Sequence, residues 1–179
     1  MMTPPSFAKT GAAVLALTGV WFAAAQAQPP QRTTATYEDW TVRCETVTPP
    51  GGAAPIKSCE LVQSTTAQGQ PNPITQVAIG RSSKTEPLRI VFQVPVNVWL
   101  PTGVKLVYDE KEPGLAATFK RCAPVGCFAD ADLKDDMLRK LRARTTPGHF
   151  EFKDAIQRDA KIPVSFKGFG QAMDALAKE

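Results

Sequence analysis

Alternation of apolar and polar residues dominates the middle of the chain. In LRIVFQV (residues 88–94) and GVKLVYD (residues 103–109), every second residue is apolar, and Phe92 lies at the centre of the first run. A period of two is the spacing of a β-strand with one face in a core. ITQVAIG, LAATFKRC, HFEF and IPVSF are further strand candidates. Pro and Gly clusters separate these runs at the intervals typical of an antiparallel sandwich or barrel.

Helical spacing appears only late in the chain. After Asp130, which stands where a cap would, apolar residues recur every three or four positions, and the closing GFGQAMDALAKE (residues 168–179) repeats this pattern. In the first of these two segments the apolar residues are Leu133, Met137, Leu138 and Leu141. We therefore predict an all-β or β-rich fold: a single antiparallel β-sandwich-like domain with one inserted helix and a C-terminal helix.

The first 27 residues have the pattern of a secretory leader. Lys9 precedes an uncharged apolar run over residues 11–25, and Ala25-Gln26-Ala27 supplies a small-x-small cleavage site. The run is shorter than the roughly 20 apolar residues that cross a bilayer. We predict a signal peptide over residues 1–27, and export to the periplasm, with the outer membrane and the medium as alternative destinations. No later segment is apolar enough to span, so we expect no transmembrane segment in the mature form.

The remainder has the length of one domain. Its first part, QPPQRTTAT, is rich in Pro and Thr and lacks apolar alternation. We therefore expect a flexible N-terminus over residues 28–38 and a single disulfide-stabilised domain over residues 39–179.

Four cysteines follow the leader, an even number that permits three connectivities. An oxidising compartment lets disulfides persist. Cys44 ends the strand-like YEDWTVRC and Cys59 opens the strand-like CELVQS, with the loop-forming TPPGGAAP between them. Two antiparallel strands joined by that loop would bring the two sulfurs together, so we predict a Cys44–Cys59 bond.

The second pair, Cys122 and Cys127, encloses Ala-Pro-Val-Gly. Pro favours the second position of a turn and Gly tolerates a positive φ, so these four residues can reverse the chain and place the cysteines opposite each other. We predict a structural Cys122–Cys127 bond. The alternative is a thiol–disulfide oxidoreductase that uses this pair, for which Arg121 and a helix starting near Asp130 would be the activating features. CAPVGC departs from the C-x-x-C spacing of such enzymes.

Charge and aromatic residues indicate candidate contact surfaces. The net charge is only +4, and no basic face of the kind that binds phosphates is evident, so we expect no nucleic-acid partner. One basic cluster lies in MLRKLRAR, which is either the solvated side of a helix or a surface for an anionic partner. Trp99 lies between prolines in VPVNVWLP, a segment that can project apolar residues from a loop. The candidate partner-contact residues are Trp99, Arg139, Lys140, Arg142 and Arg144.

Candidate catalytic residues are scarce. His149 is the only histidine, so a multi-histidine metal site cannot form and a Ser-His-Asp triad would depend on this one residue. Neither a G-x-G-x-x-G nor a phosphate-loop lysine motif occurs. We therefore expect no catalytic, cofactor-binding or metal-binding residues, no cofactor, and no enzymatic activity.

Five blocks in this order resemble the invasion-associated locus B family of exported bacterial proteins. They are EDWTVRC, KSCELVQS, LRIVFQVPVNVWLPTGVKLVYD, FKRCAPVGCFADADL and IPVSFKGFGQAMDAL, which together span residues 39–176. The resemblance implies a periplasmic or envelope-associated, disulfide-bonded, β-rich protein, with a role of some members in host-cell entry and no known catalytic residues. We predict a non-catalytic interaction module with a role in host-cell association, whose partner is an unknown protein or envelope component. The oligomeric state stays open.

Overall fold

Residues 31–49, 53–69 and 72–179 are described by the structure, a computed structural model. The predicted signal peptide and cleavage site lie outside these residues. Within them, strands make up most of the regular structure and two short α-helices the rest. The strands are β1 (Gln31–Tyr37), β2 (Trp40–Val47), β3 (Ile56–Thr65), β4 (Thr75–Gly80), β5 (Arg89–Val94), β6 (Val104–Val107), β7 (Leu115–Ala123), β8 (Gly126–Asp132), β9 (Gly148–Lys153) and β10 (Asp159–Val164). The helices are α1 (Asp135–Arg142), α2 (Phe169–Ala177) and the 3-10 turn η1 (Leu100–Thr102).

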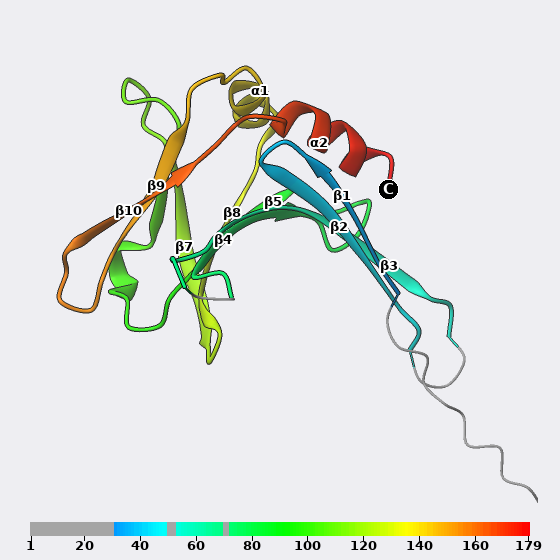
Figure 1. The fold of residues 1–179 in the computed structure, drawn as a ribbon, viewed down its shortest axis with the longest axis horizontal. Helices are drawn as coiled ribbons and strands as arrows, with labels where there is room; N and C mark the ends of the chain where they lie inside the picture. The colour runs from blue at the N-terminus through cyan, green and yellow to red at the C-terminus, as the bar shows by residue number, and fades with distance from the viewer. Residues whose placement is uncertain (1–30, 50–52, 70–71) are drawn as a thin grey trace, which may run out of the picture.

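All described strands join one antiparallel sheet in the order β1-β2-β3-β4-β5-β8-β7-β6-β9-β10. The sheet arches and curls, so that β9 and β10 stand away from the long β1–β3 end (Figure 1). Phe92 on β5 and Phe150 on β9 show how far the curl goes: their ring centroids are 5.3 Å apart although β8, β7 and β6 separate the two strands in the sheet. The β-rich antiparallel fold is confirmed, and its two facing layers belong to one continuous sheet.

The core fills the inside of this curl. Phe92 is fully buried, as are Val104, Leu106 and Tyr108 on the predicted inward face of the second alternating segment. Burial of every second residue in these two segments confirms the strand assignments made from their period of two.

The C-terminal helix α2 covers the β1–β3 end of the sheet. Trp40 on β2 packs edge-on against Phe169 of α2, with ring centroids 5.2 Å apart, and its indole N–H donates to the Ser165 carbonyl (2.8 Å). The inner face of α2 contributes Ala172, Met173 and Leu176 to the core. This helix confirms the prediction for the closing segment.

Two expectations about local structure were wrong. Of the predicted flexible N-terminus, residues 28–30 lie outside the described residues, whereas Gln31–Tyr37 forms β1, paired over its whole length with β2. A turn at Glu38 and Asp39 brings this segment back against β2. The inserted helix does not begin near Asp130. That residue belongs to β8, and α1 starts at Asp135, after Lys134 with no side-chain cap.

Candidate functional site

Both disulfides join residues that directly face each other on neighbouring antiparallel strands. Cys44 on β2 pairs in register with Cys59 on β3, and Cys122 on β7 with Cys127 on β8. In each pair the Cα atoms are 4.0 Å apart. The structure therefore contains the two local bonds predicted from the sequence, and each one links two strands that backbone hydrogen bonds already hold together.

The second disulfide closes a hairpin whose turn is Pro124 and Val125. Gly126 follows with φ 145°, and a Cβ there would lie 2.6 Å from the carbonyl oxygen of Val94, so a side chain has no room. Strands flank both cysteines, so neither sulfur lies at a helix N-terminus, where a thiolate would be stabilised. The Arg121 guanidinium lies over the ring of Phe128, 4.3 Å from its centroid.

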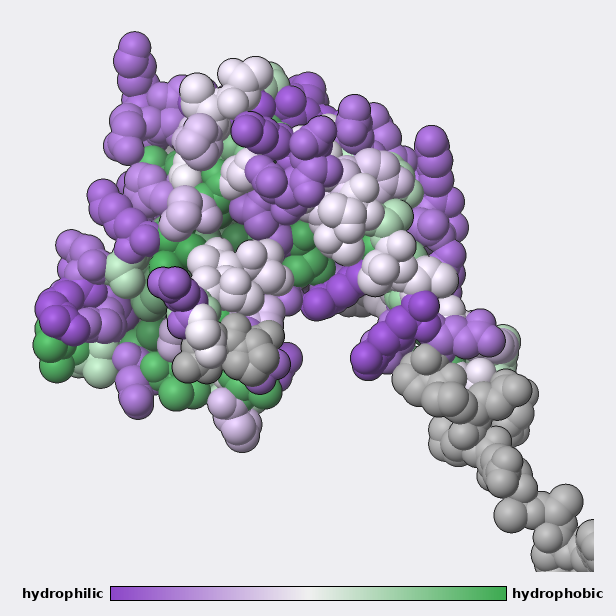
Figure 2. Space-filling model, viewed as in Figure 1, coloured by the Kyte–Doolittle hydropathy of each residue, from purple (hydrophilic) through white to green (hydrophobic). Residues whose placement is uncertain are grey.

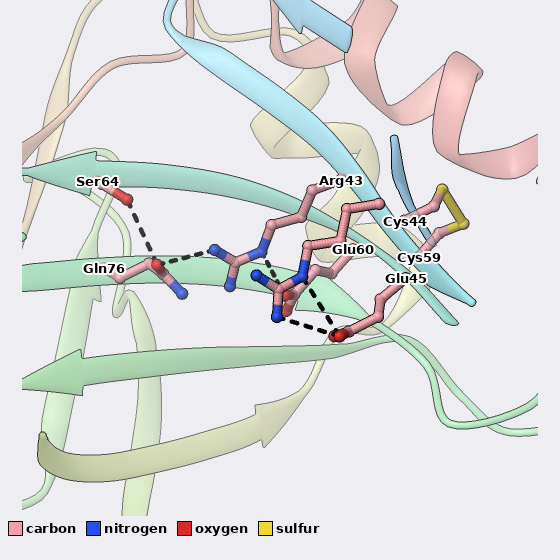
Figure 3. A network of polar contacts seen from close by, with 8 residues as sticks. Arg43, Cys44, Glu45, Cys59, Glu60, Ser64 and Gln76 are labelled. Carbon is pink, nitrogen blue, oxygen red and sulfur yellow. Dashed lines mark hydrogen bonds and ion pairs between the residues drawn. A yellow bond between two sulfur atoms is a disulfide. The ribbon is translucent and has the colours of Figure 1, made fainter. Parts of the chain in front are cut away.

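The sheet face opposite the core carries a polar network on β1 to β4 (Figure 3). Arg43 donates to Glu60 (2.6 Å) and reaches Gln76 (3.5 Å), while Arg32 pairs with Glu45 (3.2 Å). Arg32, Arg43, Glu45 and Glu60 line a concavity of about 370 Å³. Because cations and carboxylates alternate across the strands, they neutralise one another, and exposed pairs of this kind each contribute only about 0–1 kcal/mol to stability.

A second hollow, of about 210 Å³, lies between α2 and the start of β3. Leu138, Met173 and Leu176 form its apolar wall, and Cys59 is part of its lining. A carboxylate oxygen of Glu179 lies within 4.8 Å of the sulfurs of Cys44 and Cys59. These sulfurs are bonded to each other, so they cannot act as the thiolates that a metal ion requires.

Three of the four cations proposed from the sequence already have partners within the molecule. Lys140 pairs with Glu112 (2.7 Å), Arg142 with Asp174 (2.8 Å) and Arg144 with Asp109 (2.7 Å). Arg139 forms no ion pair with any described residue. These ion pairs connect the α1 region to α2 and to the loop after β6. The sequence indicated a solvated helix face or a surface for an anionic partner, and neither includes these contacts within the molecule.

These contacts shift the pKa values of the groups involved. The hydrogen bond to Glu112 raises the pKa of Lys140, and the same bond lowers the pKa of Glu112. The backbone N–H of Lys111 donates to Asp109 (3.0 Å) and lowers the pKa of its carboxyl, an effect to which Arg144 adds. Burial raises the pKa of the nearby Tyr108 hydroxyl, which donates to Glu112 (3.3 Å). Each shift favours the charge state present in these contacts at neutral pH.

Trp99 lies on the loop before η1 and is 38% exposed. Its backbone N–H donates to the Lys153 carbonyl (2.9 Å), and Val98 forms a bridge with Asp154, so the end of β9 holds this loop. Val96, Leu100 and, on the adjoining β9–β10 turn, Ile156 are also exposed. We call Val96, Trp99, Leu100 and Ile156 the Trp99 surface. Hydrophobic side chains are visible at this end of the molecule, near the β9–β10 hairpin (Figure 2).

Asp154 orders the β9–β10 turn, which carries Ile156 of the Trp99 surface. Its carboxylate accepts hydrogen bonds from the backbone N–H groups of Ile156 (3.0 Å) and Arg158 (2.9 Å) and from the Arg158 side chain (2.8 Å). The bond from the Arg158 backbone is the main cause of the lowered pKa of this carboxyl. Because one anion holds the whole turn, the exposed Ile156 is presented from an ordered backbone.

His149 lies on β9, between β10 and β6. Its Nε2 is buried without a hydrogen-bond partner among the described groups, and the nearest carboxylate oxygen, on Glu151, is 3.7 Å away. Such a position is typical of a structural strand residue, and no hydroxyl of the described residues makes the contact with the imidazole that a triad needs.

Comparison with known proteins places these features in a family. The family model described as invasion associated locus B (IalB) protein matches residues 40–177. The chain belongs to the IalB family. Among curated proteins, invasion protein B homologs of Brucella abortus strain 2308 and of its biovar 1 strain 9-941 are each 26% identical over 149 residues, which covers 79% of this chain and 77% of the relative.

A solved structure has the same fold. The crystal structure of invasion associated protein b from Bartonella henselae matches with a TM-score of 0.66 and 19% identity, covering 82% of this chain and 95% of that one. Both disulfides and the Trp99 surface of this IalB chain lie inside the region matched by the family model.

Sequence reasoning missed the residues that organise these surfaces. Asp109, Glu112 and Asp174 are 28–35 positions away from the cations they bind, and no local pattern marks them as partners. Asp154 did carry a signal, because the carboxylate of an Asp at the start of a turn often accepts a hydrogen bond from the backbone two residues further along. The described helices include none long and apolar enough to cross a membrane.

Proposed function

We propose that this IalB protein is exported to the cell envelope and acts there without catalysis, by binding a protein or envelope component through the Trp99 surface. The observation that carries the proposal is the exposure of Trp99 on a loop whose backbone is bonded to β9. Trp is among the residues that contribute most to binding when it enters a partner's pocket. A loop that is already ordered loses little further entropy on binding. Two disulfides, typical of oxidising compartments, support the exported location.

Of the four cations in and directly after α1, Arg139 is the one that we expect to contact the edge of the bound partner. Lys140, Arg142 and Arg144 would first have to leave Glu112, Asp174 and Asp109. A role in host-cell association would follow if the partner is a host protein. This part of the proposal rests on the names of the Brucella and Bartonella relatives.

Site-specific crosslinking in living cells tests the Trp99 surface. A photoreactive residue at position 99 should capture a partner, whereas the same residue at position 47 should not, because Val47 is exposed (48%) but lies at the β1–β3 end of the sheet. With the captured partner in hand, Trp99→Ala should weaken binding about tenfold or more, and Val47→Ala should leave it unchanged. Equal capture at both positions would contradict the proposal.

The alternative of a thiol–disulfide oxidoreductase has one observation in its favour, the exposure of Cys122. Equilibration of the exported protein with glutathione buffers separates the two functions. A structural bond should stay oxidised until the buffer potential falls below about −300 mV, whereas a catalytic pair is already reduced at a less negative potential. Rapid reduction of the Cys122–Cys127 bond by the glutathione pool would favour the enzyme.

A further inference from the structure

β1 ends the sheet, and its outer edge has no strand beside it among the described residues. The first six of its seven residues are exposed, and the seventh, Tyr37, is half-buried. An edge of this kind presents unpaired N–H and C=O groups and is a template for another strand.

Two independent observations show which backbone groups of β1 point outward. Tyr37 and Trp40 flank a two-residue turn, so they exchange both backbone hydrogen bonds, and alternation along the strand then directs Ala35 and Thr33 toward β2. The Cys44 and Cys59 Cα atoms are 4.0 Å apart, close to the ~4.5 Å of a non-hydrogen-bonded pair.

The Cys44 backbone groups therefore point away from β3 and toward its β1 partner, Thr33. Both observations give the same assignment. The N–H and C=O groups of Arg32, Thr34 and Thr36 face outward.

The opposite edge of the sheet is protected, whereas the β1 edge is not. β10 carries Pro163, which has no N–H to donate, and the exposed Lys161, and both are devices that prevent strand addition. β1, QRTTATY, contains neither Pro nor Lys. With one open edge among the described strands of each molecule, pairing of copies closes at a dimer instead of continuing into a fibre.

We propose that β1 pairs with β1 of a second copy of this chain, antiparallel and around a two-fold axis at Thr34. In this register Thr34 faces its own equivalent, and Arg32 faces Thr36 of the second copy. Facing threonines are a favourable cross-strand pair. The two Arg32 side chains lie four positions apart, about 13 Å, and each is already paired with its own Glu45. The edge is thus self-complementary in hydrogen bonding and free of like-charge contact.

The inner side of β1 is held firmly enough to serve as such a template. Gly168, which precedes α2, contacts the hairpin so closely that a Cβ there would lie 2.1 Å from the Tyr37 carbonyl oxygen. The hydroxyls of Thr36 and Thr41 lie 3.3 Å apart on the polar face. Because β2, α2 and the Cys44–Cys59 bond already fix the hairpin, pairing orders little additional chain.

Sedimentation equilibrium of the exported protein tests the dimer. The wild-type protein should dimerise reversibly, and Thr34→Pro should weaken dimerisation by at least about tenfold, because proline removes an outward N–H in each copy and leaves the bonds to β2 in place. Thr34→Val is the matched control: it keeps the N–H and should dimerise like wild type. Equal melting temperatures of the two variants at concentrations where both are monomeric would show that the fold is intact.

A cysteine substitution tests the register. Thr34→Cys should crosslink two copies under mild oxidation, because hydrogen-bonded strand partners have Cα atoms about 5.5 Å apart, within disulfide range. Thr36→Cys should crosslink far less, since its equivalent lies four positions away. A wild-type protein that remains monomeric at all concentrations, or a Thr34→Pro variant that dimerises as tightly as Thr34→Val, would overturn the proposal. So would pairing of β1 with a different protein in place of a second copy.

Discussion

Phe92 is the side chain on which the two halves of the curled sheet meet. It is fully buried on β5, and its ring lies against that of Phe150 on β9. Phe92→Ala should lower the free energy of unfolding by about 3–5 kcal/mol, because the change removes buried surface and leaves a cavity. Urea unfolding followed by fluorescence measures this difference. Val47→Ala, at an exposed position, should change the stability by less than about 0.5 kcal/mol, and a similarly small loss at Phe92 would contradict its place in the core.

Also at the scale of residues, the basic cluster in and after α1 is interpreted differently once its ion-pair partners are known. From the sequence alone, this basic cluster is either the solvated side of a helix or a surface for an anionic partner. In the structure, three of its four cations form ion pairs with carboxylates of the loop after β6 and of α2. The raised pKa of Lys140 and the lowered pKa values of Glu112 and Asp109 favour the charged forms of these three groups at neutral pH. Such residues stabilise local structure and are poor candidates for capturing a ligand.

At the scale of elements, each disulfide adds a covalent bond to an existing strand pair. In the chain-entropy model, the stabilisation grows with the length of chain enclosed, which is 15 positions for Cys44–Cys59 and 5 for Cys122–Cys127. Replacing the first pair with serines should lower the free energy of unfolding by about 3 kcal/mol, and replacing the second by about 2 kcal/mol. Thermal and urea unfolding of the two double variants provide the comparison. If the Cys122 and Cys127 replacements abolished an activity without changing stability, the bond would have a chemical role.

Local sequence patterns predicted those elements whose residues alternate strongly or surround a distinctive turn. β5, β6 and the Cys122–Cys127 hairpin belong to this group, because an apolar face or an Ala-Pro-Val-Gly turn specifies them without reference to the rest of the chain. β1 could not be found in this way. Its Thr-rich residues are almost all exposed, so it has no apolar face, and its pairing depends on β2. Asp130 predicts too early a start for α1, because an Asp inside β8 is the same residue type as a helix cap, and only strand pairing distinguishes the two.

At the scale of the whole molecule, the candidate sites depend on contacts between distant segments. Trp99 could be identified from its proline-flanked loop, but its anchoring by Lys153 and its proximity to the turn that Asp154 organises require the fold. The same is true of the open β1 edge, which exists because the order of strands places β1 at one end of the sheet. Alternation of apolar and polar residues can predict a strand, but only the order of strands in the sheet shows whether that strand lies at an edge.

The curl of the sheet makes an energetic prediction for the whole molecule. If β5 and β9 face each other across the core, Phe92 and Phe150 should be coupled although three strands separate them along the sheet. A double-mutant cycle with Phe92→Leu and Phe150→Leu should give a coupling energy of about 0.5–1.5 kcal/mol, the usual contribution of an aromatic pair beyond its buried area. Phe150→Leu combined with Val47→Ala should instead be additive, because Val47 lies exposed at the β1–β3 end. Additive effects of the two phenylalanine substitutions would mean that the two halves of the sheet do not close on one core.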